Sequence, residues 1–174
     1  MMRVAIVGHS QLPRNLDHNL DDVEVKIFRA PGARASRFNT ITKLKNVLEY
    51  SHDVTILWIG SNDIDQETQP RQLAETIIQV AETIEERCGS RVTLVEVECR
   101  EYPRGSTVIS NEGYRRVKRS VNRALSRSRF TRINFGAIKY TLATDGVHFE
   151  TSAKEEINKE LVNHIKNFTR VRTD

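Results

Sequence analysis

The sequence is poor in the features that stabilise small secreted domains or anchor a chain in a membrane. Only two of its 174 residues are cysteines, Cys88 and Cys99, and neither stands in a metal-ligand or redox spacing. No apolar run approaches the ~20 residues of a membrane span, and the apolar stretch at the N-terminus is too short for a signal peptide. We therefore expect two free thiols, no membrane span, and a reducing compartment, the cytoplasm or the nucleus.

Internal repeats, low-complexity tracts and linker-like stretches are absent as well, which predicts one domain spanning residues 1–174. A chain of this length can bury roughly two-thirds of its unfolded surface, so its core needs neither disulfides nor metals. Hydrophobic residues make up 38% and charged residues 29% of the chain, which is ordinary for a soluble globular protein. The formal net charge is only +4, so its meaning depends on where the charges lie.

Strand-like and helix-like segments alternate along the chain. Apolar runs and alternations predict strands over residues 3–7, 23–28, 54–59, 92–97 and 131–135. Apolar residues at helical spacing predict helices over residues 40–50, 70–87 and 112–126, and a last helix that opens at a capping box beginning with Ser152. This alternation indicates an α/β protein, whose parallel sheet is covered by helices on both faces.

Residues with chemical capacity follow the predicted strands. Ser10 comes after the first strand, Gly32 after the second and Asn62 after the third, while Asp145 and His148 stand between the fifth strand and the last helix. Ligands of parallel α/β sheets bind beyond the carboxyl ends of the strands. These five residues are therefore predicted to meet at one edge of the sheet.

The residue types are those that an acyl-transfer site requires. A serine hydroxyl attacks only when an imidazole takes its proton, and the imidazole needs an orienting carboxylate. Ser10 is the candidate nucleophile, His148 the base and Asp145 its partner, while the Gly32 N–H and the Asn62 amide can donate to an oxyanion. Singly, Ser10 could cap a helix and the other residues could form turns; their combination favours catalysis.

Four blocks of the sequence resemble those of the SGNH (GDSL-type) hydrolase superfamily, in the same order. They are Gly8-His9-Ser10, Gly32, Gly60-Ser61-Asn62-Asp63 and Asp145-Gly146-Val147-His148. The resemblance covers about residues 3–165 and implies a three-layer, flavodoxin-like fold with esterase, lipase or deacetylase chemistry and no cofactor. It also implies that the Ser10 N–H completes the oxyanion hole formed by Gly32 and Asn62.

The sequence departs from the family pattern at His9, because the family usually has aspartate before the serine. That aspartate is outside the triad, but the bonding around the nucleophile turn is left open. The alternative α/β-hydrolase pattern, G-x-S-x-G, fits less well because Leu12 occupies the place of the second glycine. Of the remaining residues, Asp63 is interpreted as structural and Trp58 as core, and three histidines are expected at the surface: His18, His52 and His164.

The positive charge is concentrated in one segment. Residues 113–144 contain nine Lys and Arg and no acidic residue. The chain is also similar to the compact SGNH domains encoded in animal retroelements, which accompany nucleic-acid-binding proteins. Candidate nucleic-acid contacts are Arg115, Arg116, Arg119, Arg123 and Arg127. The alternative interpretation is a solvated helix face whose charges pair with acids such as Glu82, Glu85 and Glu86.

Two functions follow from these patterns. The first is a serine esterase that hydrolyses small or accessible acyl esters, of acetyl or lipid type, through an acyl-enzyme on Ser10, without metal or cofactor. The second is a nucleic-acid-binding module on an SGNH scaffold, which uses the basic segment 115–132.

Overall fold

The computed structural model describes residues 1–16, 20–101, 108–135 and 149–173. Within them the strands form one all-parallel sheet in the order β2-β1-β3-β4-β5. The strands are β1 (Met2–Gly8), β2 (Val23–Arg29), β3 (Val54–Trp58), β4 (Arg91–Val95) and β5 (Thr131–Ile133). The predicted α/β class and five-stranded parallel sheet are therefore confirmed, with β4 and β5 each two residues shorter at the carboxyl end than predicted.

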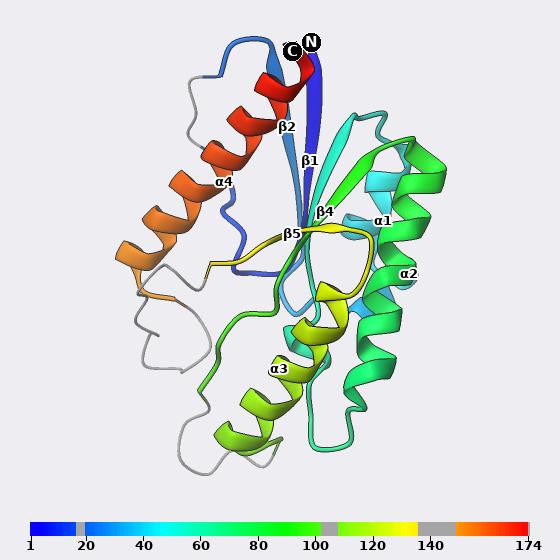
Figure 1. Ribbon diagram of the computed structural model, residues 1–174, viewed down its shortest axis with the longest axis vertical. Coiled ribbons are helices and arrows are strands. Elements are labelled where there is room, and N and C mark those ends of the chain that lie inside the picture. Colours follow the sequence, from blue (N-terminus) through cyan, green and yellow to red (C-terminus); the bar gives the residue numbers. More distant parts are fainter. Residues whose placement is uncertain (17–19, 102–107, 136–148, 174) are drawn as a thin grey trace.

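Helices cover both faces of the sheet (Figure 1). On one face lie α1 (Thr42–Lys45), α2 (Pro70–Cys88) and α3 (Asn111–Ser126), and on the other lies α4 (Thr151–Thr173). Strand β1 is buried on both sides: Ala5 and Val7 belong to the core under the first group, and Val4 and Ile6 to the core under α4. This explains why β1 is a continuous apolar run instead of an alternating one.

The prediction of one helix over residues 40–50 is wrong. The segment consists of a 3-10 helix (Ala35–Thr40), the four-residue α1, and a second 3-10 helix (Asn46–Glu49). Ile41 is extended between the first two, where a run of β-branched residues weakens helical propensity. Leu44 and Val47 are fully buried as expected, because a spacing of three residues also suits a 3-10 turn.

The ends of the long helices are set by residues that favour helix termini. Pro70 occupies the first turn of α2, as predicted, and Gly89 ends that helix in a left-handed conformation with φ of 61°. Ser110 caps α3 by accepting a hydrogen bond from the Gly113 N–H, at 3.0 Å. Helix α4 begins at Thr151, so Ser152 lies within its first turn and is not the residue before it.

Both ends of the chain lie at the same pole of the sheet (Figure 1). Met2 at the start of β1 and Phe168 near the end of α4 pack in the same hydrophobic cluster. The opposite pole carries the carboxyl ends of the strands and therefore the candidate site. No helix in the described part of the chain is long and apolar enough to cross a membrane, and Cys88 and Cys99 are both free, as predicted.

Candidate active site

The turn that carries Ser10, the candidate nucleophile, begins where β1 and β3 approach each other closely, and we call it the nucleophile turn. A Cβ atom at Gly8 would lie 2.0 Å from the carbonyl oxygen of Trp58, so only glycine fits at this position. Ser10 lies in this turn, which is bound by Arg29, the last residue of β2. The Arg29 guanidinium donates one hydrogen bond to the Ser10 carbonyl, at 3.2 Å, and another to the Leu12 carbonyl, at 3.0 Å. Ser10 is partly exposed, which the candidate role of nucleophile requires.

His9 is fully buried beneath this turn. Its Nδ1 accepts a hydrogen bond from the Gln11 N–H, two residues on, at 3.2 Å. An aspartate makes the same bond in an Asx-turn, so His9 can replace the usual aspartate as the acceptor. The ring also packs against Trp58 with centroids 5.3 Å apart, and its Nε2 lies 3.3 Å from Glu98 Oε2. The imidazole therefore reaches a carboxylate as well as the turn.

Gly32 lies in the turn after β2. Its φ of 73° is in the left-handed region, and the Ala33 N–H donates to the Ala30 carbonyl at 3.1 Å. With Pro31 at the second position, this geometry matches a type II turn, which favours glycine at the third. A Cβ at Gly32 would meet nothing within 4 Å, so glycine is needed here for its backbone conformation.

Asn62 lies in a short 3-10 helix (Ser61–Asp63) that follows β3. Its Nδ2 donates to the Ala33 carbonyl at 2.9 Å, and its Oδ1 accepts from Arg100 at 3.0 Å. The first bond joins Asn62 to the turn that contains Gly32. The structure thus brings together the two loops that carry the candidate oxyanion donors.

Asp63 binds the chain after the Gly32 turn through its carboxylate. This agrees with the prediction that Asp63 has a structural role. Its carboxylate accepts hydrogen bonds from the Ala35 N–H at 2.7 Å and from the Ser36 N–H at 3.1 Å. It also accepts from Ser36 Oγ at 2.8 Å. Asp63 is buried, so these bonds fix the chain directly after the Gly32 turn.

Glu98 and Arg100, which were not predicted from the sequence, form a buried ion cluster in the segment after β4. Both are only 5% exposed, and Arg100 Nη2 lies 3.6 Å from Glu98 Oε2. Burial by itself raises the pKa of a carboxyl, but the contacts of Glu98 with His9 and then with Arg100 outweigh this and lower its pKa to about 2. An acidic residue directly after a predicted strand, at the same edge as Ser10, was the available signal.

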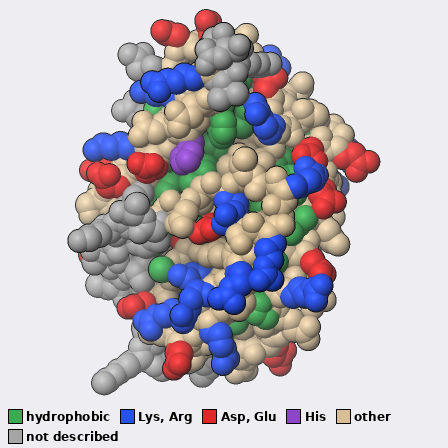
Figure 2. All heavy atoms as spheres, in the orientation of Figure 1, with side chains coloured by type: hydrophobic (Ala, Val, Ile, Leu, Met, Phe, Trp, Pro, Cys, Tyr) green, Lys and Arg blue, Asp and Glu red, His purple; other side chains and the backbone are tan. Residues whose placement is uncertain are grey.

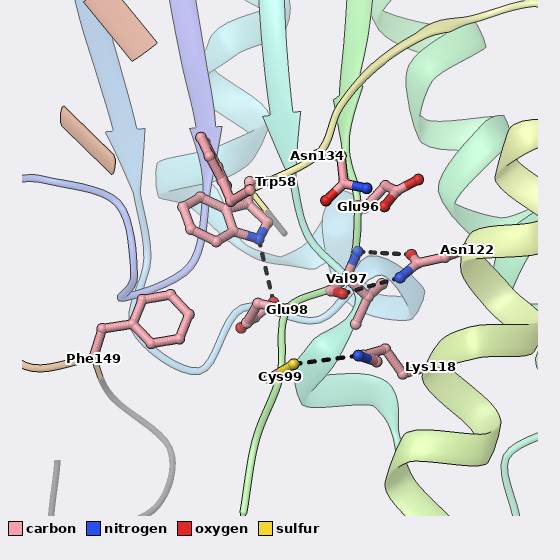
Figure 3. Close-up of a pocket in the computed structure, with 10 residues that line it drawn as sticks. Trp58, Glu96, Val97, Glu98, Cys99, Lys118, Asn122, Asn134 and Phe149 are labelled. Carbon is pink, nitrogen blue, oxygen red and sulfur yellow. Dashed lines mark hydrogen bonds between the residues drawn. The ribbon is translucent and has the colours of Figure 1, made fainter. Parts of the chain in front are cut away.

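Trp58 joins this cluster to a neighbouring cavity of about 250 Å³ (Figure 3). It is fully buried, as predicted, and its Nε1 donates to Glu98 Oε1 at 3.2 Å. Phe149 adds a second aromatic wall, and Asn122 and Lys118 of α3 form a polar one. The cavity therefore adjoins the nucleophile turn through Trp58, whose ring contacts His9.

Asp145 and His148 lie outside the described residues, so their part in a triad stays a prediction. The first described residue after them is Phe149, whose backbone N–H donates to Gln11 Oε1 at 3.5 Å. Gln11 directly follows Ser10. The chain after His148 is thus anchored beside the nucleophile turn.

The predicted basic face lies on α3, where Lys and Arg side chains gather in Figure 2. All five candidate contacts, Arg115, Arg116, Arg119, Arg123 and Arg127, are exposed. Arg115 pairs with Glu101 at 3.1 Å, whereas among the described residues no carboxylate pairs with the other four. Of the three acids suggested as partners, Glu85 forms an ion pair, with Arg129.

His52 contradicts its predicted surface position. It is buried before β3, where its ring nitrogens contact the Tyr50 carbonyl and, at 2.6 Å, Thr55 Oγ1. Burial lowers the pKa of His52, although the Tyr50 contact opposes this. His164 is half-buried, so it too is not fully at the surface, and burial lowers its pKa; His18 lies outside the described residues.

The described residues form a parallel α/β sheet that has serine, glycine and asparagine on loops at its carboxyl edge. Solved structures show the same architecture. A protein of Slackia heliotrinireducens with a provisional assignment as an SGNH hydrolase superposes with a TM-score of 0.68 at 17% identity, over 93% of this chain and 97% of that one.

Two esterases match more closely in TM-score. The aryl esterase of M. smegmatis gives 0.74 at 14% identity, over 96% of this chain and 99% of that one. Est24, a carbohydrate acetylesterase of Sinorhizobium meliloti, gives 0.75 at 11% identity, over 97% and 100%. No protein-family model and no curated protein sequence matches the chain. The chain therefore has the SGNH-hydrolase fold, and at these identities the likeness is one of fold.

Proposed function

We propose that this protein is a serine esterase that cleaves small or accessible acyl esters through an acyl-enzyme on Ser10. The observation that carries the proposal is the hydrogen bond from Asn62 to the Ala33 carbonyl. It joins the Asn62 loop to the Gly32 turn, on the edge of the sheet where β1 delivers Ser10. Amide and backbone donors held in this way can stabilise the charge that develops on an ester oxygen.

In the proposed reaction the His148 imidazole, oriented by Asp145, takes the proton of the Ser10 hydroxyl. The Ser10 oxygen bonds to the ester carbonyl carbon, whose oxygen becomes negative and accepts hydrogen bonds from the Ser10 N–H, Gly32 and Asn62. The carbon–oxygen bond to the alcohol then breaks, and His148 returns the proton to the departing alcohol. Water repeats the sequence on the acyl-enzyme, releasing the acid and restoring Ser10.

Among the structural neighbours, one is described as an aryl esterase and another as a carbohydrate acetylesterase, which makes acetyl esters the first substrates to test.

The test is hydrolysis of nitrophenyl acetate and butyrate by the wild type and by three variants. Ser10→Ala removes the nucleophile, and we expect kcat to fall by about 10³-fold or more. Asn62→Ala removes one oxyanion donor, and we expect a fall of about 10²–10³-fold. Ser51→Ala is the matched control, because Ser51 is exposed and precedes β3 at the opposite pole. Equal rates for wild type and Ser10→Ala would exclude the proposed function.

A second function, nucleic-acid binding through α3, is favoured by the pairing pattern of its arginines. Arg116, Arg123 and Arg127 are exposed and have no carboxylate partner among the described residues. Arg123 and Arg127 also line a groove of about 670 Å³ between α2 and α3. Unpaired guanidinium groups along a groove suit phosphate oxygens, which they can bind bidentately.

Affinity for a labelled single-stranded RNA, measured against salt concentration, tests this second function. Each phosphate contact contributes a log–log slope of about −0.7 for a single strand. We expect the double reversal Arg119→Glu with Arg123→Glu to weaken binding. It should also make the log–log slope less steep by the contribution of about two phosphate contacts. Arg91→Glu is the control, since Arg91 is an exposed arginine at the start of β4. A salt-independent affinity, or equal binding by both variants, would rule out this function.

A further inference from the structure

We propose that Glu98 and Arg100 are positioning residues: one buried ion cluster that orients the Asn62 amide through Arg100 and holds the nucleophile turn through His9. The proposal rests on the esterase function proposed above and adds two residues to its machinery. Neither residue is offered as a group that touches substrate.

Arg100 determines which way the Asn62 amide faces. The two ends of an amide have similar shapes, but a guanidinium has only N–H donors. Arg100 Nη2 donates to Asn62 Oδ1 at 3.0 Å and to Ser61 Oγ at 2.7 Å. The Asn62 NH₂ group must therefore face away from Arg100. One of its protons binds the Ala33 carbonyl, and the other is left for an oxyanion.

Glu98 keeps the buried arginine in place. A guanidinium removed from water is very unfavourable unless a carboxylate compensates its charge. Among the described residues, Glu98 is the carboxylate that contacts Arg100, at 3.6 Å. The hydrogen bond from Trp58 to its other oxygen fixes the carboxylate in turn. The position of Arg100, and with it the orientation of Asn62, depends on Glu98.

The same carboxylate faces the nucleophile turn through His9. Because Nδ1 of His9 accepts a hydrogen bond from the Gln11 N–H, its ring proton lies on Nε2. That nitrogen is the one 3.3 Å from Glu98 Oε2. Glu98 thus favours the tautomer in which Nδ1 is free to hold the turn. His9 and Glu98 form a matched pair, since an aspartate at position 9 would place two carboxylates close together in the interior.

A double-mutant cycle between Arg100 and Asn62 separates positioning from general stability. With nitrophenyl acetate, we expect Arg100→Met to lower kcat by about 10- to 100-fold and to change KM by less than about twofold. This loss is smaller than that of removing the donor itself. In the Asn62→Ala background, Arg100→Met should have almost no further effect on kcat. A full loss in both backgrounds would overturn the proposal, because Arg100 would then act independently of Asn62.

Arg100→Met leaves Glu98 buried without its partner, so the variant can fail to fold. The double variant Glu98→Gln with Arg100→Met removes both charges together and is the second probe. We expect it to be folded by circular dichroism and to lose at least as much kcat as Arg100→Met. Wild-type kcat in this folded double variant would refute the positioning role. Arg91→Met, with an exposed arginine at the opposite pole, is the control for the loss of a guanidinium.

A readout that needs no turnover keeps this inference distinguishable from the proposed function. The side-chain amide of Asn62 gives its own proton–nitrogen correlation in nuclear magnetic resonance spectra. We expect that signal to shift in Glu98→Gln with Arg100→Met and to stay unchanged in Arg91→Met. If the wild type is inactive but the Asn62 signal shifts in the double variant, the esterase function is excluded and the role of Arg100 in orienting the amide is kept. If the wild type is active but the Asn62 signal does not shift, the positioning role is overturned and the esterase function is kept.

Discussion

Acidification is a direct test of the buried Glu98 carboxylate. Its pKa is lowered from an ordinary value of 4.5 to about 2 in the folded protein, because its contacts with His9 and Arg100 outweigh its burial. In the unfolded chain these contacts are absent. Between the two pKa values the unfolded state therefore binds one more proton at this position than the folded state. Because folding lowers the pKa of this carboxyl, its contribution to the free energy of unfolding is complete above pH 4.5. That contribution is lost as the pH falls towards 2.

The size of the effect follows from the interval between the two pKa values. One proton of difference changes the free energy of unfolding by about 1.4 kcal/mol per pH unit. From pH 4.5 to about 2, Glu98 should thus account for a loss of about 3 kcal/mol. Because this is a large part of the ~5–15 kcal/mol that stabilises most domains, protonation of Glu98 should contribute strongly to acid unfolding.

Two measurements test the lowered pKa of Glu98 and its effect on stability. Urea unfolding at several pH values gives the free energy for the wild type and for the charge-free double variant Glu98→Gln with Arg100→Met. The wild type should lose about 3 kcal/mol more than the variant between pH 4.5 and 2. Carbon-13 resonances of the Glu98 carboxyl should also show no protonation near pH 4.5 in the folded protein. A midpoint at or above pH 4.5 before unfolding would refute the reasoning.

Three substitutions extend the test to the rest of the fold, each measured by urea unfolding. Gly8→Ala should cost about 3 kcal/mol or more, because its Cβ would lie 2.0 Å from the Trp58 carbonyl oxygen; a loss below about 1 kcal/mol would contradict this close approach. Asp63→Ala removes the acceptor of the buried Ala35 N–H and should cost about 1–3 kcal/mol for that donor alone, with a smaller loss in Asp63→Asn. Leu161→Ala in α4, fully buried, should cost about 2–5 kcal/mol; an unchanged midpoint would mean that α4 does not cover the sheet.

The candidate site could be predicted where it depends on strand ends. Ser10, Gly32 and Asn62 each follow an apolar run, and parallel pairing brings such positions to one edge. Glu98 also follows a predicted strand, but its position alone does not distinguish it and Arg100 from surface residues. Two charged residues near the end of a strand resemble a solvated surface, and only the pairing of β3 with β4 places them against His9 and Trp58.

The errors in the fold have local physical causes. The spacing of Leu44 and Val47 fits both helix types, and the sequence pattern alone does not distinguish them. His52 was expected at the surface because it is polar and precedes a strand. It is buried because Thr55 Oγ1 and the Tyr50 carbonyl satisfy both ring nitrogens, and such pairing makes burial of an imidazole tolerable.

The shared pole of the chain ends has a practical consequence for attaching the protein to other molecules. Strand β1 runs from that pole to the Gly8 turn, a distance of about 20 Å at ~3.3 Å per residue. A surface or a fused domain joined at either end would therefore lie at the pole opposite the candidate site. The edge of the sheet that carries Ser10 would stay open to solution. A short peptide joining the two ends would close the chain into a ring at the pole where those ends lie. Such a ring could be reopened at an exposed turn without crossing the edge that holds Ser10.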